Sequence, residues 1–155
     1  MLRLSKRTDY ALIAMRHLAG NADRGWASAR EIAAAYEVPV ELLAKVLQRL
    51  VRKGLLASHQ GINGGYELAR PATEISVAQV IEAIDGPLTM TACSDGDDQS
   101  CDQFAHCNIR DPLWRIKDRI VAALETCSIH EMASEVPPAT TVPVSFVPPK
   151  PAHAG

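Results

Sequence analysis

The chain has 155 residues, of which 47% are hydrophobic and 22% are charged, and its formal net charge is −2. These values are typical of a globular protein of about one domain with an additional arm. No run approaches the roughly 20 apolar residues of a membrane-spanning helix, and the charged N-terminal segment does not resemble a signal peptide. We therefore expect a cytoplasmic protein without a membrane partner, whose four cysteines are thiols or metal ligands more often than disulfides.

The charge is divided unevenly along the chain. Residues 1–70 hold 11 Lys and Arg against 6 Asp and Glu, whereas residues 71–155 hold 5 against 12. A basic half joined to an acidic half is typical of a protein in which only the first half meets a polyanion. A surface charge without functional meaning explains the asymmetry equally well, so charge alone does not decide between the two interpretations.

Two helices are predicted before residue 40. The first covers residues 6–19, where apolar side chains recur at helical spacing. The second begins at Ser28, because Ser28 and Glu31 have the spacing of a capping box, in which each side chain binds the backbone amide of the other residue. It ends at Tyr36, which we expect to face inward, and the residue before a proline closes it.

A third helix and a β-hairpin follow. The helix covers residues 39–53, because proline is favoured in a first turn and Gly54 occupies the left-handed position that follows many helices. Residues 55–58 and 66–68 are predicted as short strands joined by the glycine-rich turn 61–65. Two short helices, a tight turn and a hairpin in residues 1–70 together predict a winged helix-turn-helix.

The third helix and the hairpin carry the residue types that contact DNA. The outer face of the helix is polar and has basic side chains suited to phosphates, and glycines at the hairpin tip let the backbone approach a duplex closely. Each charge alone is equally well explained as a solvated surface group, but the ordered set predicts double-stranded operator DNA as a partner. The residues assigned to DNA binding are Ser28, Val40, Glu41, Lys45, Gln48, Arg49, Arg52, His59, Gln60, Gly61, Asn63 and Gly64.

The second half of the chain divides into four segments. They are a connecting helix and loop (71–92), a cysteine loop (93–110), a long helix with a closing turn (111–133) and a Pro- and Ala-rich tail (136–155) that we expect to be disordered. Asp111 is expected to be the N-cap of the long helix, with Pro112 in its first turn.

The long helix carries an apolar seam. Leu113, Ile116, Ile120 and Leu124 follow one another at intervals of three and four residues, which is typical of a coiled-coil-like interface between two copies of a chain. The alternative is that this face packs on the helix's own domain. The fold predicted for the whole chain is therefore mainly α with a small β-hairpin wing and a long C-terminal dimerisation helix.

Three cysteines, Cys93, Cys101 and Cys107, lie in a loop rich in Gly, Asp and Ser. Structural cysteines usually lie on apolar faces, so three in a polar loop indicate thiolate ligands. An iron–sulfur cluster, zinc and free redox-active thiols all remain open, although zinc sites more often contain C-x2-C pairs. A zinc-stabilised DNA-binding protein and an electron-transfer protein are the corresponding alternatives. No nucleotide loop or nucleophile–base pair accompanies the cysteines, so no enzyme is predicted, and Cys127 is expected to be a packing residue.

Together these motifs resemble the Rrf2 family of bacterial transcriptional regulators. The resemblance covers residues 1–133 and rests on segments 4–11, 61–66 and 74–81 and on the cysteine loop followed by 111–114. It implies a homodimeric winged-helix repressor that carries a [2Fe–2S] or [4Fe–4S] cluster on the three cysteines, with cluster state setting DNA affinity. Branches of the family sense cluster supply, iron or nitric oxide, and residues 85–87 are most similar to the regulators of the SUF cluster-assembly operon.

The sequence departs from the family pattern in the ligand set and in the wing. Arg110 stands where one branch has a histidine ligand, and a guanidinium does not bind metal. Asp9 matches an aspartate that another branch contributes from the partner chain as a fourth ligand, the alternative being a charge at a helix N-terminus. Seven residues separate the first two cysteines, where many relatives have five. Gln60 replaces an arginine beside the wing glycine, which weakens the case for minor-groove insertion there.

Overall fold

The computed structural model describes residues 3–91 and 101–134. Within these ranges the helices are α1 (Lys6–Gly20), α2 (Ala29–Tyr36), α3 (Val40–Arg52), α4 (Val77–Asp85), α5 (Arg110–Thr126) and α6 (Ile129–Ala133). Short 3-10 turns lie at η1 (Ala22–Arg24), η2 (Ala72–Glu74) and η4 (Phe104–His106). The strands β1 (Leu56–His59) and β2 (Gly65–Leu68) pair antiparallel. The predicted mainly helical fold with a hairpin wing is confirmed, whereas Cys93 and the predicted disordered tail lie outside the described residues.

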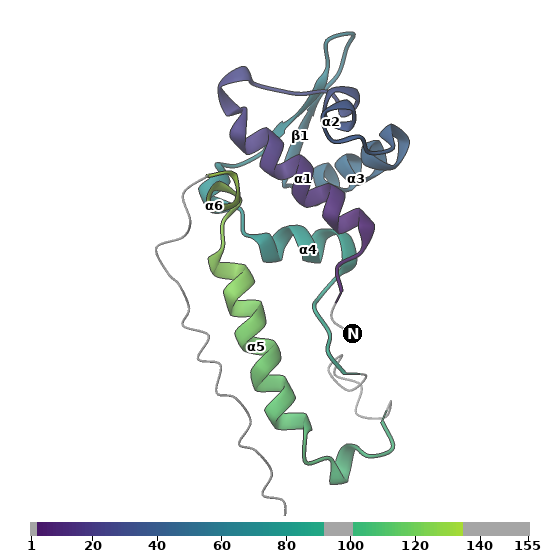
Figure 1. Ribbon diagram of the computed structural model, residues 1–155, viewed down its shortest axis with the longest axis vertical. Coiled ribbons are helices and arrows are strands. Elements are labelled where there is room, and N and C mark those ends of the chain that lie inside the picture. The colour runs from purple at the N-terminus through teal and green to yellow at the C-terminus, as the bar shows by residue number, and fades with distance from the viewer. Residues whose placement is uncertain (1–2, 92–100, 135–155) are drawn as a thin grey trace, which may run out of the picture.

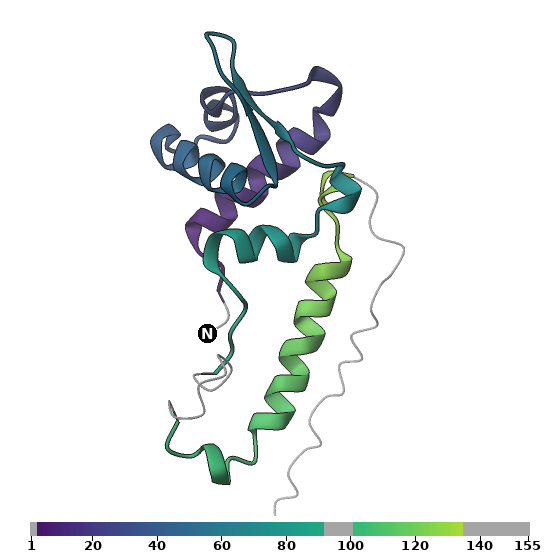
Figure 2. The same ribbon diagram turned by 180° about the vertical axis from the view of Figure 1, so that it is seen from behind.

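The hairpin forms a wing that projects beyond the helices (Figures 1 and 2). Its register places Leu56 opposite Leu68 at the base and His59 opposite Gly65 towards the tip. A hairpin of this size is marginally stable alone, and the segment before α2 adds to it, because Ala27 and Tyr66 exchange two backbone hydrogen bonds of 3.0 and 2.8 Å.

Three of the described helices begin with a serine capping box. In each capping box the serine hydroxyl accepts from the amide three residues on, and that residue's side chain accepts from the serine amide. The pairs are Ser28 with Glu31, Ser76 with Gln79, and Ser128 with Glu131. The capping box predicted at Ser28 is therefore confirmed, as is the left-handed Gly54 after α3, whose φ is 74°.

The core lies where α1, α3, α4 and α6 meet. Met15, Leu47, Ile75 and Ile129 are each fully buried, and they come from both halves of the chain. Burial of one such side chain contributes about 1.5–3 kcal/mol. Cys127 packs against the same core, which confirms its assignment as a packing residue.

A backbone bridge ties the start of α4 to the start of α6. The Val77 amide donates to the Cys127 carbonyl (2.9 Å), and the Ile129 amide donates to the Ile75 carbonyl (2.8 Å). Helix α5 leaves the core from this bridge and extends away from it (Figure 1). None of its residues is buried, and no helix of the described ranges has both the length and the apolarity needed to cross a bilayer.

Some local expectations were wrong. Tyr36, which was expected to face inward, is 43% exposed. It is the last residue of α2, and its hydroxyl oxygen lies 3.1 Å from His17 Nδ1 at the surface. Glu37 closes α2 in the left-handed region (φ 53°), with its amide donating to Ala33. Asp111 is not the N-cap of α5: the helix begins at Arg110, and the Asp111 carboxylate accepts from Arg110 Nε instead of from a helix amide.

Candidate nucleic-acid interface and cysteine segment

Helix α3 has one buried face and one polar face. Leu43, Leu47 and Leu50 are fully buried against the core. At the helical repeat of 3.6 residues, the side chains opposite this face are those of Glu41, Lys45, Gln48 and Arg52, and all four are exposed. The predicted recognition surface of the helix therefore points to solvent.

Helix α3 and the wing line an open groove of about 680 Å³. Among the residues assigned to DNA binding, those that line it are Ser28, Gln48, Arg52, His59, Gln60, Gly61 and Gly64. The groove also contains Ser58 and Tyr66, which the sequence analysis treated only as strand residues. Consecutive residues of each strand line the groove, so the alternation of side chains along a strand could not have identified these two positions.

The other assigned residues lie outside the groove. Val40, Glu41 and Lys45 are exposed on the N-terminal half of α3, and Asn63 is exposed in the turn of the wing. Arg49 faces α4 rather than the groove: its Nε donates to the Ala83 carbonyl at 2.8 Å. This side chain therefore joins the recognition helix to α4, and its predicted contact with DNA phosphate stays a prediction.

The wing is compact beside the groove. His59 Nε2 lies 2.7 Å from the Glu67 carboxylate across the two strands. A Cβ atom on Gly64 would collide with the carbonyl of His59, so the turn requires glycine at this position. Ser28, at the other edge of the groove, uses its hydroxyl oxygen as acceptor in the α2 cap. Its hydroxyl proton remains able to donate to a phosphate.

Asp85 joins the end of α4 to the start of α1. Its carboxylate accepts from the Ser5 hydroxyl (2.6 Å), the Ser5 amide (3.1 Å) and the Thr8 hydroxyl (2.8 Å). Burial alone would raise the pKa of Asp85, but these hydrogen bonds and the charge of Arg49 hold it below its ordinary value. Asp9 follows Thr8 in the first turn of α1 and is partly exposed, and its proposed role as a ligand stays a prediction.

Cys101 and Cys107 lie on either side of η4. Both are free, partly exposed thiols. The described ranges contain no group of three or more His, Cys, Asp or Glu side chains placed to hold a metal ion, and the third predicted ligand, Cys93, lies outside them. The fourth cysteine is different in character, because burial and the nearby Glu131 carboxylate raise the pKa of Cys127.

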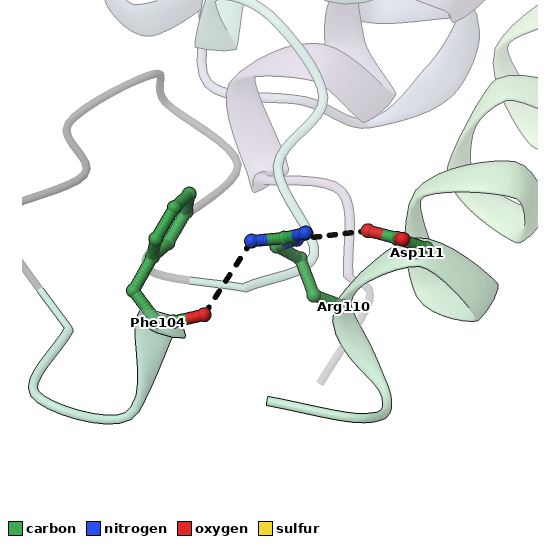
Figure 3. Close-up of polar contacts among 3 residues, drawn as sticks. All are labelled: Phe104, Arg110 and Asp111. Atoms are coloured by element: carbon green, nitrogen blue, oxygen red, sulfur yellow. Dashed lines mark hydrogen bonds and ion pairs between the residues drawn. The ribbon is translucent and has the colours of Figure 1, made fainter. Parts of the chain in front are cut away.

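Arg110 connects η4 to the first turns of α5. Its Nη1 donates to the Phe104 carbonyl (3.4 Å) and its Nε to Asp111 Oδ1 (2.8 Å), as Figure 3 shows. The guanidinium carbon lies 4.6 Å from the centre of the Phe104 ring and 5.5 Å from that of Trp114. The segment between Cys101 and Cys107 is thereby attached to α5, and the sequence analysis did not identify Phe104 or Trp114 for this role.

The predicted seam of α5 divides into two parts. Leu124 packs against the core of its own subunit, and it lines a cavity of about 300 Å³ with Ile81 of α4. Leu113, Ile116 and Ile120 lie farther from the core, and Ile116 is 45% exposed. Packing on the helix's own domain therefore holds at Leu124, and the interface between two copies of the chain at Leu113, Ile116 and Ile120 stays a prediction.

A recognition helix and a glycine-tipped wing that line one open groove define a DNA-binding domain of the winged helix-turn-helix class. The chain belongs to the Rrf2 family, whose model, described as an iron-dependent transcriptional regulator, matches residues 4–135. The family is one of transcriptional regulators and not of enzymes.

Relatives and solved structures agree with this assignment. The chain is 45% identical over 87 residues to the Mycobacterium tuberculosis regulator Rv1287, a match that covers 56% of this chain and spans about half (54%) of that relative. It is 31% identical over 134 residues to the regulator IscR of Photorhabdus laumondii, covering 86% of this chain and 80% of that one. The structure of CymR, the global cysteine regulator of Bacillus subtilis, matches with a TM-score of 0.72 and 25% identity, covering 88% of this chain and all of that one.

Proposed function

We propose that this chain is an iron–sulfur cluster-sensing repressor that acts in the cytoplasm as a homodimer on operator DNA. Its target genes would serve cluster assembly, as in the SUF system, or iron homeostasis. The observation that carries the proposal is the attachment of the cysteine segment to α5 by Arg110, because a sensor needs a physical connection between its ligand site and its DNA-binding surface. The family description and the similarity to IscR support the choice of cofactor.

The donor set suits an iron–sulfur cluster. Cys93, Cys101 and Cys107 would supply three thiolates, and Asp9 of the partner subunit would supply a carboxylate as a weaker fourth ligand. Cys101 and Cys107 are partly exposed in a polar segment, whereas the raised pKa of Cys127 disfavours its thiolate. When bound, the cluster would supply an iron centre that responds to oxidants and to iron supply.

A continuous set of contacts leads from the cysteine segment to the recognition helix. Arg110 holds the segment on α5, and α5 contacts α4, where Leu124 and Ile81 line a shared cavity. Arg49 of α3 binds the Ala83 carbonyl of α4. A change in the conformation of the cysteine segment would alter how α5 packs on α4 and, through α4, where α3 is placed. This shifts the population able to bind DNA.

The test is an anaerobic preparation with iron and sulfide analysis, combined with DNA binding before and after cluster removal. We expect Cys93→Ala, Cys101→Ala and Cys107→Ala each to lose the cluster, because three protein ligands are close to the minimum for holding one. Cys127→Ala is the matched control and should keep wild-type iron. Wild-type iron in any of the first three variants would contradict the ligand assignment, and equal DNA affinity with and without cluster would contradict sensing.

A further inference from the structure

The wing tip carries a large apolar side chain that takes no part in the fold. Ile62 is 104% exposed, more than any other large hydrophobic residue among those described. Isolated exposed apolar residues are common on protein surfaces, so exposure alone assigns no role. The position of Ile62 is more informative, because it lies in the turn of the wing, and the wing projects beyond the helices (Figures 1 and 2). Gly61 and Gly64 of the same turn line the groove.

The tip is braced from outside the hairpin. Trp26, in the segment between α1 and α2, donates from its indole Nε1 to the Asn63 carbonyl at 2.6 Å. Its ring also lies 5.2 Å from the ring of His59, between centres. Within the turn, the Gly64 amide donates to the Gly61 carbonyl at 3.0 Å. Ile62 is therefore presented on a turn that is held at both ends, which lowers the entropy lost when it binds.

Both glycines of the turn around Ile62 belong to the groove. Gly61 and Gly64 line it together with Gln48 and Arg52 of α3. The minor groove is about 6 Å wide and is too narrow for a helix, so with α3 in a major groove the projecting turn of the wing is the element that would meet the adjacent minor groove. Proteins that bind there commonly place aliphatic side chains against the bases.

We propose that Ile62 makes an apolar contact in the minor groove next to the site read by α3, and that Trp26 is the residue that positions it. The inference rests on the proposed DNA-binding function and adds a specificity determinant to it. In the minor groove a G·C pair presents the guanine N2 amino donor, which A·T pairs lack. An aliphatic side chain removes that donor from water without offering it an acceptor, which is unfavourable. Ile62 therefore selects A·T pairs.

The experiment uses the full-length protein and the duplex that it enriches from a random-sequence pool. Base pairs beneath the wing are replaced by inosine·cytosine, which keeps the minor-groove surface of A·T, or by guanine·cytosine, which differs from inosine·cytosine only by the N2 amino group. The wild-type protein should bind the inosine duplex within about twofold of the parent duplex and the guanine duplex about tenfold more weakly, as expected for one unsatisfied donor.

Variants of Ile62 test the side chain itself. Ile62→Ala should weaken binding to the parent duplex about fivefold, the size expected for loss of a partly buried aliphatic group, and should no longer distinguish inosine from guanine. Ile62→Leu, which keeps the apolar volume, should retain both properties. The salt dependence of binding should be the same in all three proteins, because no phosphate contact is removed. Circular dichroism should be unchanged, since the side chain is fully exposed.

Trp26→Phe tests the positioning role, because it keeps an aromatic ring and removes the donor to Asn63. In the Trp26→Phe background, Ile62→Ala should reduce DNA affinity by a smaller factor than in the wild-type protein. The double-mutant cycle measures this coupling between the two residues. Additive effects would overturn the role of Trp26. Unchanged affinity and discrimination in Ile62→Ala would overturn the minor-groove contact while leaving the proposed function intact. A pool from which no duplex is enriched would overturn DNA binding itself.

Discussion

Asp85 illustrates how much depends on single polar side chains in this chain. Its carboxylate accepts three hydrogen bonds from Ser5 and Thr8 at the start of α1. No other described residue joins α1 to α4 by side-chain hydrogen bonds of this kind. Because the folded state lowers the pKa of Asp85 below its ordinary value of 3.8, the ionised form stabilises the fold. This contribution is complete above the unfolded pKa and is lost as pH falls through the lower, folded pKa.

We therefore expect Asp85→Asn to lower the free energy of unfolding at pH 7 by about 1 kcal/mol, a value reduced for the partial exposure of the group. The difference from wild type should begin to shrink as pH falls below about 4, where the carboxyl of the unfolded chain takes up its proton, and should be lost once pH has fallen through the lower pKa of the folded state. Urea unfolding at several pH values measures it. Asp118→Asn, at an exposed position on α5, is the control and should change stability little. A difference that does not depend on pH would show that the charge is not responsible.

The basic residues of α3 are expected to separate into two kinds. Lys45 and Arg52 are exposed on the outer face, so replacing either by Ala should weaken binding to all DNA sequences alike. It should also make the slope of log affinity against log salt shallower by about one unit. Arg49→Ala should in addition lower the thermal unfolding temperature, because its Nε holds the Ala83 carbonyl. Titrations at several salt concentrations, with thermal unfolding of each variant, distinguish the two kinds. An unaltered slope in Lys45→Ala and Arg52→Ala would contradict the placement of α3 on the phosphates.

At the scale of elements, the side chain of Arg110 joins η4 to α5. Arg110→Leu removes both hydrogen bonds of Figure 3 and leaves the cysteines in place. We expect this variant to bind iron and sulfide as the wild type does, but to show a much smaller difference in DNA affinity between the cluster-loaded and cluster-free forms. Arg115→Leu, at an exposed position on the same helix, is the control and should respond as the wild type. A normal response in Arg110→Leu would mean that coupling runs through another contact.

Elements were predicted best where their signals are local in the chain. The capping box of Ser28 and Glu31 and the left-handed Gly54 depend on residues within three or four positions, and the structure confirms both. The side chains that join elements were not predicted, because their partners are distant: Trp26 binds the carbonyl of Asn63, 37 residues away, and Ser5 binds Asp85, 80 residues away. Such pairs depend on how finished elements pack, which helical periodicity and turn chemistry do not contain.

For the candidate site the same distinction holds. The glycines and polar residues of the groove were found because a wing and a recognition helix have recognisable local chemistry. Arg49 was assigned to DNA from its charge and its place on the outer face of the predicted helix. The structure directs its Nε to α4, since an arginine on the edge of a helix also reaches a neighbouring helix end. Asp111 was expected to cap α5, and Arg110 was considered only as a residue that stands in place of a histidine ligand. Their interaction with each other was therefore missed.

At the scale of the whole molecule, the open stretch of α5 predicts the assembly. Ile116→Glu places a charge in the middle of the exposed seam and should dissociate the proposed dimer, because a buried unpaired carboxylate costs several kcal/mol. Sedimentation velocity at micromolar concentration measures the result. Ala122→Glu lies on the opposite side of α5 and is exposed, so it should leave the assembly unchanged. Wild-type sedimentation of Ile116→Glu would place the interface elsewhere.

The backbone bridge between α4 and α6 has a mechanical consequence. It fixes α5 at its C-terminal end, next to the core, while the 17 residues of the helix extend about 25 Å to the end that adjoins the cysteine segment. A tilt of the helix by about 5° about the bridge therefore moves its far end by about 2 Å. A rearrangement of a few ångströms around Cys101 and Cys107 would reach the DNA-binding domain as a small rotation. In a dimer that rotation would be applied twice, once in each subunit, so the distance between the two recognition helices becomes the quantity that reports the state of the cysteine segment.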